Sequence, residues 1–164
     1  MEPMKILVVD DEAPVRDMIR RGLSQMGGYS VEVAQNGSEA LQKIEKDVFD
    51  LVLTDLKMPE MDGIQLLTTI KGTRPEVMVI LMTAYGTIET AVACLKNGAD
   101  DYILKPFKVE EVICLVARAL AQAKLEKENI GLRQTVHIYD ASERIHSSLQ
   151  REIIYDYILN AIID

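Results

Sequence analysis

The sequence predicts an α/β fold built on a doubly wound parallel sheet. Five short, nearly continuous apolar segments of strand length recur along the chain, at residues 5–9, 29–33, 51–53, 77–82 and 102–104. Helical patterns lie between and after them, at 14–26, 38–46, 63–71, 87–97 and from 108 onward. Apolar strands that alternate with helices are typical of a parallel sheet covered on both faces. Right-handed crossovers then place helices on both sides of that sheet.

The ends of the helical segments agree with this order of elements. Pro14 falls in the first turn of the first helix, where a missing N–H is tolerated. Thr87 is expected to cap the helix of residues 87–97. Glycines that can end a helix follow three of the segments, namely Gly27 with Gly28, Gly72 and Gly98. Local signals and the overall pattern therefore predict the same elements.

Composition restricts the class of protein. The chain of 164 residues is long enough for one ordinary domain and an appendage. Its net charge of −8 argues against a nucleic-acid footprint in this chain. No apolar run reaches the length of a membrane span, and the N-terminus lacks the cleavage site of a secretory signal. We expect a cytoplasmic protein whose Cys94 and Cys114 are reduced, because they form no CxxC pair.

The helical pattern after residue 108 continues past the point where a last covering helix should end. Leu125, Leu132 and Tyr139 follow a spacing of seven, with Asn129 and Val136 at the alternate positions. This spacing predicts either a parallel coiled-coil dimer or a solvated linker helix.

An amphipathic stripe follows Asp140, made of Ile145, Leu149, Ile153, Tyr157 and Ile158. It would pack on a partner chain or begin another domain. The predicted division is therefore a domain at 1–122, a linker or coiled coil at 123–140 and an amphipathic helix at 141–164.

Polar residues follow four of the predicted strands. In open parallel sheets, functional groups gather at the carboxyl ends of strands, next to the point where strand order reverses. The residues in these places are Asp10, Asp11 and Glu12 after the first strand, Asp55 after the third, Thr83 after the fourth and Lys105 after the fifth.

This set of residues predicts phosphoryl chemistry with a hard cation. Acidic side chains at one edge repel each other unless a cation such as Mg²⁺ lies among them. With Asp10 and Asp11 holding that ion, an oxygen of Asp55 can attack phosphorus and form an aspartyl phosphate. Lys105 and the Thr83 hydroxyl are then suited to the oxygens of the transferred group.

Each of these residues also has a purely structural interpretation. Asp10 and Asp11 can cap the first helix, and Asp55 can stabilise the loop before Pro59. Thr83 can form a turn, and Lys105 can be a surface charge. These interpretations together require four coincidences at one edge of one sheet.

Four motifs together resemble the receiver domain of two-component response regulators over residues 4–122. They are VVDDE at 8–12, TDLKMPEMDG at 54–63, LMTAYG at 81–86 and ADDYILKPF at 99–107. The resemblance implies a flavodoxin-like sheet in the order 2-1-3-4-5. It also implies that Asp55 accepts a phosphoryl group from a sensor histidine kinase.

The resemblance further implies roles for individual residues. Asp10 and Asp55 bind Mg²⁺ with the main-chain carbonyl of Lys57, and Asp11 acts directly or through water. Thr83 and Lys105 contact the phosphoryl oxygens.

A switch and a tuning pair are implied in the same way. Thr83 is drawn toward the phosphoryl group, and Tyr102 turns inward. This rearrangement changes the face formed by the helix of residues 87–97, the strand of residues 102–104 and the helix from residue 108, which is a second possible dimer interface. Lys57 and Tyr85 occupy positions that tune the lifetime of the phosphorylated form.

The resemblance also bears on the output. Residues 81–92 are similar to receivers of the enhancer-binding activator group, and the tail from Tyr139 is more weakly similar to the first helix of a GAF-type sensory domain. No GxxxxGK loop and no helix-turn-helix follows, so we expect no nucleic-acid binding by this chain itself.

Three other functions compete with a signalling switch. A haloacid-dehalogenase-like phosphohydrolase would carry its nucleophile in a DxD pair on the first strand, whereas Asp55 is on another strand. A receiver that serves only for dimerisation would usually lack Asp55 or Lys105, and both are present. A dinucleotide-binding domain would need GxGxxG after the first strand.

Overall fold

The computed structural model describes residues 3–84 and 88–125. Its elements are β1 (Lys5–Val9), α1 (Ala13–Gln25), β2 (Ser30–Ala34), α2 (Gly37–Lys46), β3 (Leu51–Asp55), α3 (Gly63–Thr73), β4 (Met78–Thr83), α4 (Ile88–Lys96) and β5 (Asp101–Leu104). Residues 109–125 are also helical. The chain divides into two compact units, Met1–Ala123 and Lys124–Asp164.

The five strands form one parallel sheet in the order β2-β1-β3-β4-β5. This confirms the predicted fold class and strand order. The order reverses between β1 and β3, because the chain builds β2 on one side of β1 and the remaining strands on the other. Residues that follow β1 and end β3 therefore meet at the position where open sheets of this type place their functional groups.

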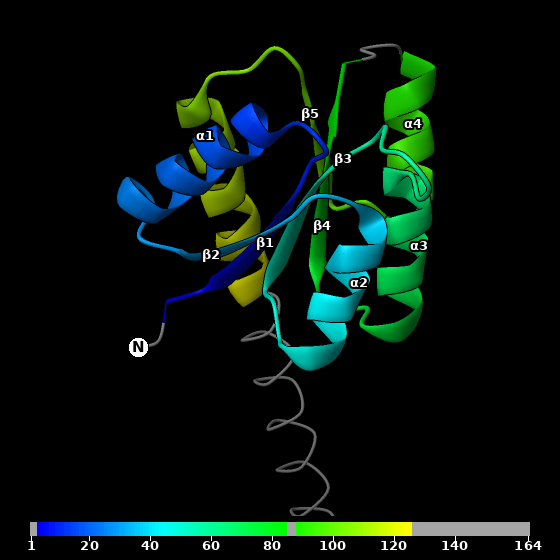
Figure 1. Cartoon of the computed structure of the whole chain (residues 1–164), viewed down its shortest axis with the longest axis horizontal. Coiled ribbons are helices and arrows are strands. Elements are labelled where there is room, and N and C mark those ends of the chain that lie inside the picture. The colour runs from blue at the N-terminus through cyan, green and yellow to red at the C-terminus, as the bar shows by residue number, and fades with distance from the viewer. Residues whose placement is uncertain (1–2, 85–87, 126–164) are drawn as a thin grey trace, which may run out of the picture. The chain divides into compact units, whose positions relative to one another are not determined.

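Helices cover both faces of the sheet, as Figure 1 shows. α1 and the helical residues 109–123 cover one face, and α2, α3 and α4 cover the other. Because side chains alternate along a strand, each central strand contributes to two cores. Leu51 and Leu53 of β3 pack toward the face of α1, whereas Val52 packs toward α2 and α3. β3 is buried along its whole length, as a central strand of a parallel sheet should be.

The predicted helix ends are mostly confirmed. Pro14 lies in the first turn of α1. Gly28 and Gly98 follow α1 and α4 with positive φ of 70° and 93°, a conformation that glycine adopts without strain. The expectation that Gly72 ends α3 is wrong, because α3 continues to Thr73. Pro75 sets this end, since the residue before a proline is disfavoured in a helix.

Two short caps fix the starts of α2 and α3. Asn36 accepts a hydrogen bond from the backbone N–H of Glu39 at 2.8 Å. Asp62 and Gln65 form a reciprocal capping box at the start of α3. The cap of α3 is important for function because it closes the loop that begins at Asp55.

Several sequence predictions fall partly or wholly outside the described residues. These are the Thr87 cap, the amphipathic stripe after Asp140 and the heptad seam apart from Leu125, which is exposed. Within residues 3–84 and 88–125, no helix has both the length and the apolar character that a membrane span requires. Cys94 and Cys114 are both free thiols.

Candidate functional site

The carboxyl ends of the strands bring together the polar residues that the sequence singled out. Asp10 follows β1, Asp55 ends β3 and Thr83 ends β4. All three are buried, with residue exposures of 0%, 8% and 2%. Buried carboxylates need a cation or several hydrogen bonds to offset their lost hydration, so the contacts of Asp10 and Asp55 are central to this site.

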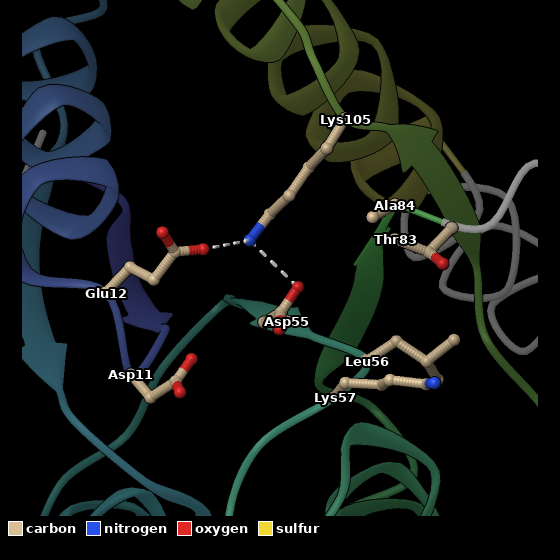
Figure 2. A pocket seen from close by; sticks show the side chains of 8 residues that line it. All are labelled: Asp11, Glu12, Asp55, Leu56, Lys57, Thr83, Ala84 and Lys105. Carbon is tan, nitrogen blue, oxygen red and sulfur yellow. Dashed lines mark ion pairs between the residues drawn. The ribbon is translucent and has the colours of Figure 1, made fainter.

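Lys105 supplies that cation from the segment after β5. Its Nζ lies 2.8 Å from Asp10 Oδ2, 2.9 Å from Asp55 Oδ1 and 3.8 Å from Glu12 Oε1. Figure 2 shows its side chain reaching across the pocket toward Asp55 and Glu12. Its backbone is fixed by a hydrogen bond of 2.7 Å from its N–H to the carbonyl of Thr83. The Lys105 side chain is only 15% exposed, so the interpretation as a surface charge is wrong.

The loop after β1 holds Asp10 from several directions. Asp10 Oδ1 accepts a hydrogen bond of 2.8 Å from the backbone N–H of Glu12. Its own N–H donates to the carbonyl of Ala34 at 3.2 Å, and its carbonyl accepts a hydrogen bond from the guanidinium of Arg16. The N-cap of α1 is Glu12, so Asp10 and Asp11 are not the caps that the structural interpretation required.

Asp55 is mounted on a rigid backbone. The next residue, Leu56, donates its N–H to the carbonyl of Met82 at 2.8 Å and accepts from Gly63 at 2.8 Å. A Cβ at Gly63 would overlap with the carbonyl oxygen of Asp55, so only glycine allows α3 to start this close. The buried Thr54 hydroxyl donates to the same carbonyl at 3.1 Å. These contacts fix the backbone at the strand end that carries the Asp55 side chain.

A pocket of about 270 Å³ opens over Asp55. The residues around it are Asp11, Glu12, Asp55, Leu56, Lys57, Thr83, Ala84 and Lys105, all of which Figure 2 labels. Asp10 is fully buried and does not line this pocket, but its side chain contacts the pocket residue Lys105. The space is large enough for a phosphoryl group with its bound waters.

Charge in the pocket perturbs two pKa values. Burial raises the pKa of the Asp55 carboxyl, and the negative charges of Asp10 and Asp11 raise it further, while Lys105 opposes the shift. For Lys105, burial alone would lower the pKa of the ammonium. The hydrogen bonds and charges of Asp10 and Asp55 outweigh that effect and raise it. Lys105 is therefore cationic throughout the neutral pH range.

The donor set suits a hard divalent cation that uses few protein ligands. Among the described residues, no group of three or more acidic, histidine or cysteine side chains is spaced as a preformed metal cage. Mg²⁺ usually takes one or two carboxylates and keeps several waters, so a cage is not required. The carboxylates of Asp10, Asp11, Glu12 and Asp55 lie in or beside this pocket with the two lysines Lys57 and Lys105, so negative charge is in excess here. A cation between Asp10 and Asp55 would relieve that excess and would compete with Lys105 for the same oxygens.

The remaining predicted residues lie in different places. Asp11 and Lys57 are exposed and line the pocket. Tyr102 does not line it and is half-buried against the core on the face of α2, α3 and α4. Tyr102 pairs with Leu81 in the sheet, which places it on the same face as Thr83, one pleat away. Tyr85 lies outside the described residues.

Sequence reasoning assigned no role to two residues that contact the site. Glu12 was noted only as a neighbour of the acidic pair, yet its carboxylate faces Lys105. Arg16 is one helical turn further along α1 and binds the carbonyl of Asp10. Arg16 follows the N-cap Glu12 by four residues, so both lie on one side of α1, and this spacing could have predicted the contact with Asp10.

Known proteins resemble this chain in sequence and structure. Residues 6–120 match the family model described as the response regulator receiver domain. The transcriptional regulatory protein ZraR of Klebsiella oxytoca is 43% identical over 129 residues, which cover 79% of this chain and 29% of that protein.

Solved structures of response regulators also resemble this chain. A CheY-like response regulator receiver domain protein from Methanospirillum hungatei is 35% identical with a TM-score of 0.72, over 76% of this chain and 99% of that one. NtrX from Brucella abortus is 38% identical with a TM-score of 0.75, over 80% of this chain and 30% of that one.

The family defines the general chemistry. The chain spans less than a third of the length of ZraR and NtrX, and the remaining regions of those two proteins lie outside the alignment. Response regulators are signalling proteins that receive phosphoryl groups from sensor histidine kinases, and receiver domains in general need Mg²⁺ for this reaction. Phosphorylation on an aspartate is the general function of the family. With its sheet order, its acidic edge and its match over residues 6–120, this chain belongs to the response regulator receiver domain family of two-component systems.

Proposed function

We propose that Asp55 is the phosphoacceptor of this receiver domain. The observation that carries this assignment is the position of Asp55 Oδ1, 2.9 Å from the Lys105 ammonium at the floor of an open pocket. Asp10 is fully buried and its oxygens are already engaged by Glu12 and Lys105, so it is poorly placed to attack. Asp11 is exposed, and Lys105 forms its ion pairs with Asp10, Glu12 and Asp55 instead.

The residues of the pocket divide the work of phosphoryl transfer. One oxygen of Asp55 attacks phosphorus, and the ammonium of Lys105 stabilises the negative charge on the transferred group. Thr83 lines the same pocket, and its hydroxyl would donate to another phosphoryl oxygen. Bound Mg²⁺ supplies additional positive charge for the phosphoryl oxygens. Asp10, Asp55 and the main-chain carbonyl of Lys57 would hold it, with Asp11 bound directly or through water.

Thr83 and Tyr102 form the proposed switch. Because Thr83 is buried at the end of β4, movement of its hydroxyl toward a phosphoryl group leaves space behind it. Tyr102 lies on the same face of the neighbouring strand and is only half-buried, so its ring can move into that space. This movement would change the surface of α4, β5 and the helical residues 109–125. Lys57 and Tyr85 are proposed to tune the lifetime of the phosphorylated form.

Partners follow from the same proposal. The phosphodonor is a sensor histidine kinase in the cytoplasm, and the chain catalyses only its own phosphorylation and dephosphorylation. A homodimer forms either through the C-terminal helix or through the face of α4, β5 and residues 109–125, where Val92, Leu95 and Leu104 are exposed. We also propose that the receiver domain ends at residue 122 and that the linker or coiled coil ends at residue 140. Light scattering of the full chain, compared with a truncation after Gln122, tests the C-terminal route.

The assignment of Asp55 is tested by mass spectrometry. The full chain incubated with acetyl phosphate and Mg²⁺ should gain one phosphoryl group, and Asp55→Asn should gain none. Asp50→Asn is a matched control, because Asp50 lies at the opposite end of β3. An unchanged mass of the parent protein, or continued labelling of Asp55→Asn, would exclude Asp55 as the acceptor.

A further inference from the structure

The carboxylate of Glu12 stands at the mouth of the phosphoacceptor pocket. Its Oε1 lies 3.8 Å from the Lys105 ammonium, and its side chain is 65% exposed. In Figure 2 Glu12 faces Lys105 from the side opposite Thr83. Glu12 therefore adds a carboxylate to the pocket, on the side open to solvent.

The local structure around Glu12 depends on its backbone and not on its side chain. Glu12 is the N-cap residue of α1, but its side chain accepts no capping hydrogen bond. Its backbone does the structural work, because the N–H donates to Asp10 Oδ1 and the carbonyl accepts from the N–H of Arg16 at 3.1 Å. A change of side chain at this position leaves those backbone contacts in place.

We propose that Glu12 is an electrostatic filter that slows phosphorylation of Asp55 by small anionic donors. The inference rests on the proposed role of Asp55 and adds a determinant of donor specificity. Two effects act in the same direction. The charge of Glu12 repels an anion that enters the pocket. Its carboxylate also attracts the Lys105 ammonium and so competes with the phosphoryl oxygens for that charge.

The reaction that Glu12 slows can be written for acetyl phosphate. An oxygen of Asp55 forms a bond to phosphorus, and the bond between phosphorus and the bridging oxygen breaks. Acetate leaves with the electron pair of that bond, and Asp55 becomes an acyl phosphate. Acetyl phosphate is a dianion near neutral pH, whereas phosphoramidate, whose leaving group is ammonia, is mostly a monoanion. The filter should therefore act more strongly on acetyl phosphate.

The test compares Glu12→Gln with the parent chain and with Glu45→Gln. Glu45 is an exposed residue of α2, on the other face of the sheet, and serves as the matched loss of one charge. Phosphorylation rates with Mg²⁺ and each donor are measured at low and high ionic strength. We expect Glu12→Gln to react roughly three-fold faster with acetyl phosphate at low salt. The gain should be smaller with phosphoramidate and should shrink at high salt, because salt screens exposed charges.

Other outcomes separate this inference from the assignment of Asp55. Equal rates for Glu12→Gln and the parent at low salt would overturn the filter and leave the role of Asp55 intact. A gain that is the same for both donors and at every salt concentration would overturn it too, since it would indicate a change in geometry. If the parent chain takes up no phosphoryl group at all, the assignment of Asp55 fails, and the filter fails with it.

Discussion

Lys105 Nζ lies 2.9 Å from Asp55 Oδ1, although Asp55 ends β3 and Lys105 follows β5. The same ammonium lies 2.8 Å from the fully buried Asp10, so one lysine balances two carboxylates at the switch point. We therefore expect the fold to depend on Lys105 even without a bound phosphoryl group.

Loss of the Lys105 ammonium should destabilise the domain. Lys105→Met leaves Asp10 and Asp55 without their common cation, and removal of one partner from a buried ion pair usually costs about 3–5 kcal/mol. Because Asp55 is slightly exposed, we expect a decrease of about 2–4 kcal/mol in the free energy of unfolding at neutral pH. Urea denaturation measures this change, and added Mg²⁺ should restore more stability to the variant than to the parent.

Lys46→Met is the control for that experiment. Lys46 is exposed at the end of α2 and should change stability by less than about 0.5 kcal/mol. Equal stability of Lys105→Met and Lys46→Met would show that the lysine contributes nothing to the resting fold.

Neutralising Asp55 should have the opposite effect. The folded-state pKa of Asp55 is raised, first by burial and then by the charges of Asp10 and Asp11. A carboxyl with a raised pKa favours the folded state when it is protonated, and this stability is lost as pH rises through the folded pKa. Without Mg²⁺, Asp55→Asn should therefore be more stable than the parent at neutral pH.

The difference between Asp55→Asn and the parent should disappear in acid. Below the ordinary pKa of an aspartate, the parent carboxyl is protonated in both the folded and the unfolded chain. Denaturation curves at several pH values follow this convergence. A variant that is less stable than the parent at neutral pH would contradict the electrostatic description of the site.

Two glycines of α3 offer a matched pair for the backbone of the site. Gly63→Ala places a Cβ against the carbonyl of Asp55 and should lower the free energy of unfolding by about 1–3 kcal/mol. Gly72→Ala meets nothing within 4 Å and should raise it by up to about 1 kcal/mol, because alanine is the better helix former. Thermal unfolding of both variants tests the pair. Effects of the same sign would disprove the close approach of α3 to Asp55.

The proposed switch predicts a local response at Tyr102. In protein labelled with fluorotyrosine, the Tyr102 resonance should shift when the chain is phosphorylated by acetyl phosphate with Mg²⁺, and Tyr102→Phe assigns that resonance. Tyr29 is the internal control, because it packs against the opposite face of the sheet. Thr83→Val keeps the shape of Thr83 without its hydroxyl and should abolish the shift. A shift that persists in phosphorylated Thr83→Val would remove Thr83 from the switch.

The sequence was sufficient for the fold because every level of its pattern agreed. Continuous apolar strands such as Leu51–Leu53 predicted burial on both faces, and the sheet order is confirmed. Element ends were less accurate, with β2 running one residue later than expected. Gly72 was assigned to a helix end because glycine often ends helices, but the proline three residues later determines where α3 stops.

The site was predictable only as a set of residues at one edge. The strand ends predicted that Asp10, Asp55, Thr83 and Lys105 gather there, and they do. Which carboxylates share the ammonium could not be predicted, because it depends on side-chain conformations. The contact between Glu12 and Lys105 is of this kind. The absence of Tyr102 from the pocket has another cause, the pairing register of β5 with β4, which places Tyr102 beside Leu81.

Side chains of the central strands alternate between the two faces of the sheet, so Asp55 and Thr83 point toward opposite faces. Asp55 continues the series of Leu51 and Leu53 toward the α1 face, whereas Thr83 continues that of Val79 and Leu81 toward the α4 face. The hydrogen-bonded sheet thus separates the face toward which Asp55 points from the face that carries Tyr102. In the proposed switch, the change would pass around the strand ends, from Asp55 to Thr83, and not through the sheet. Neither hydrophobic core would then have to open.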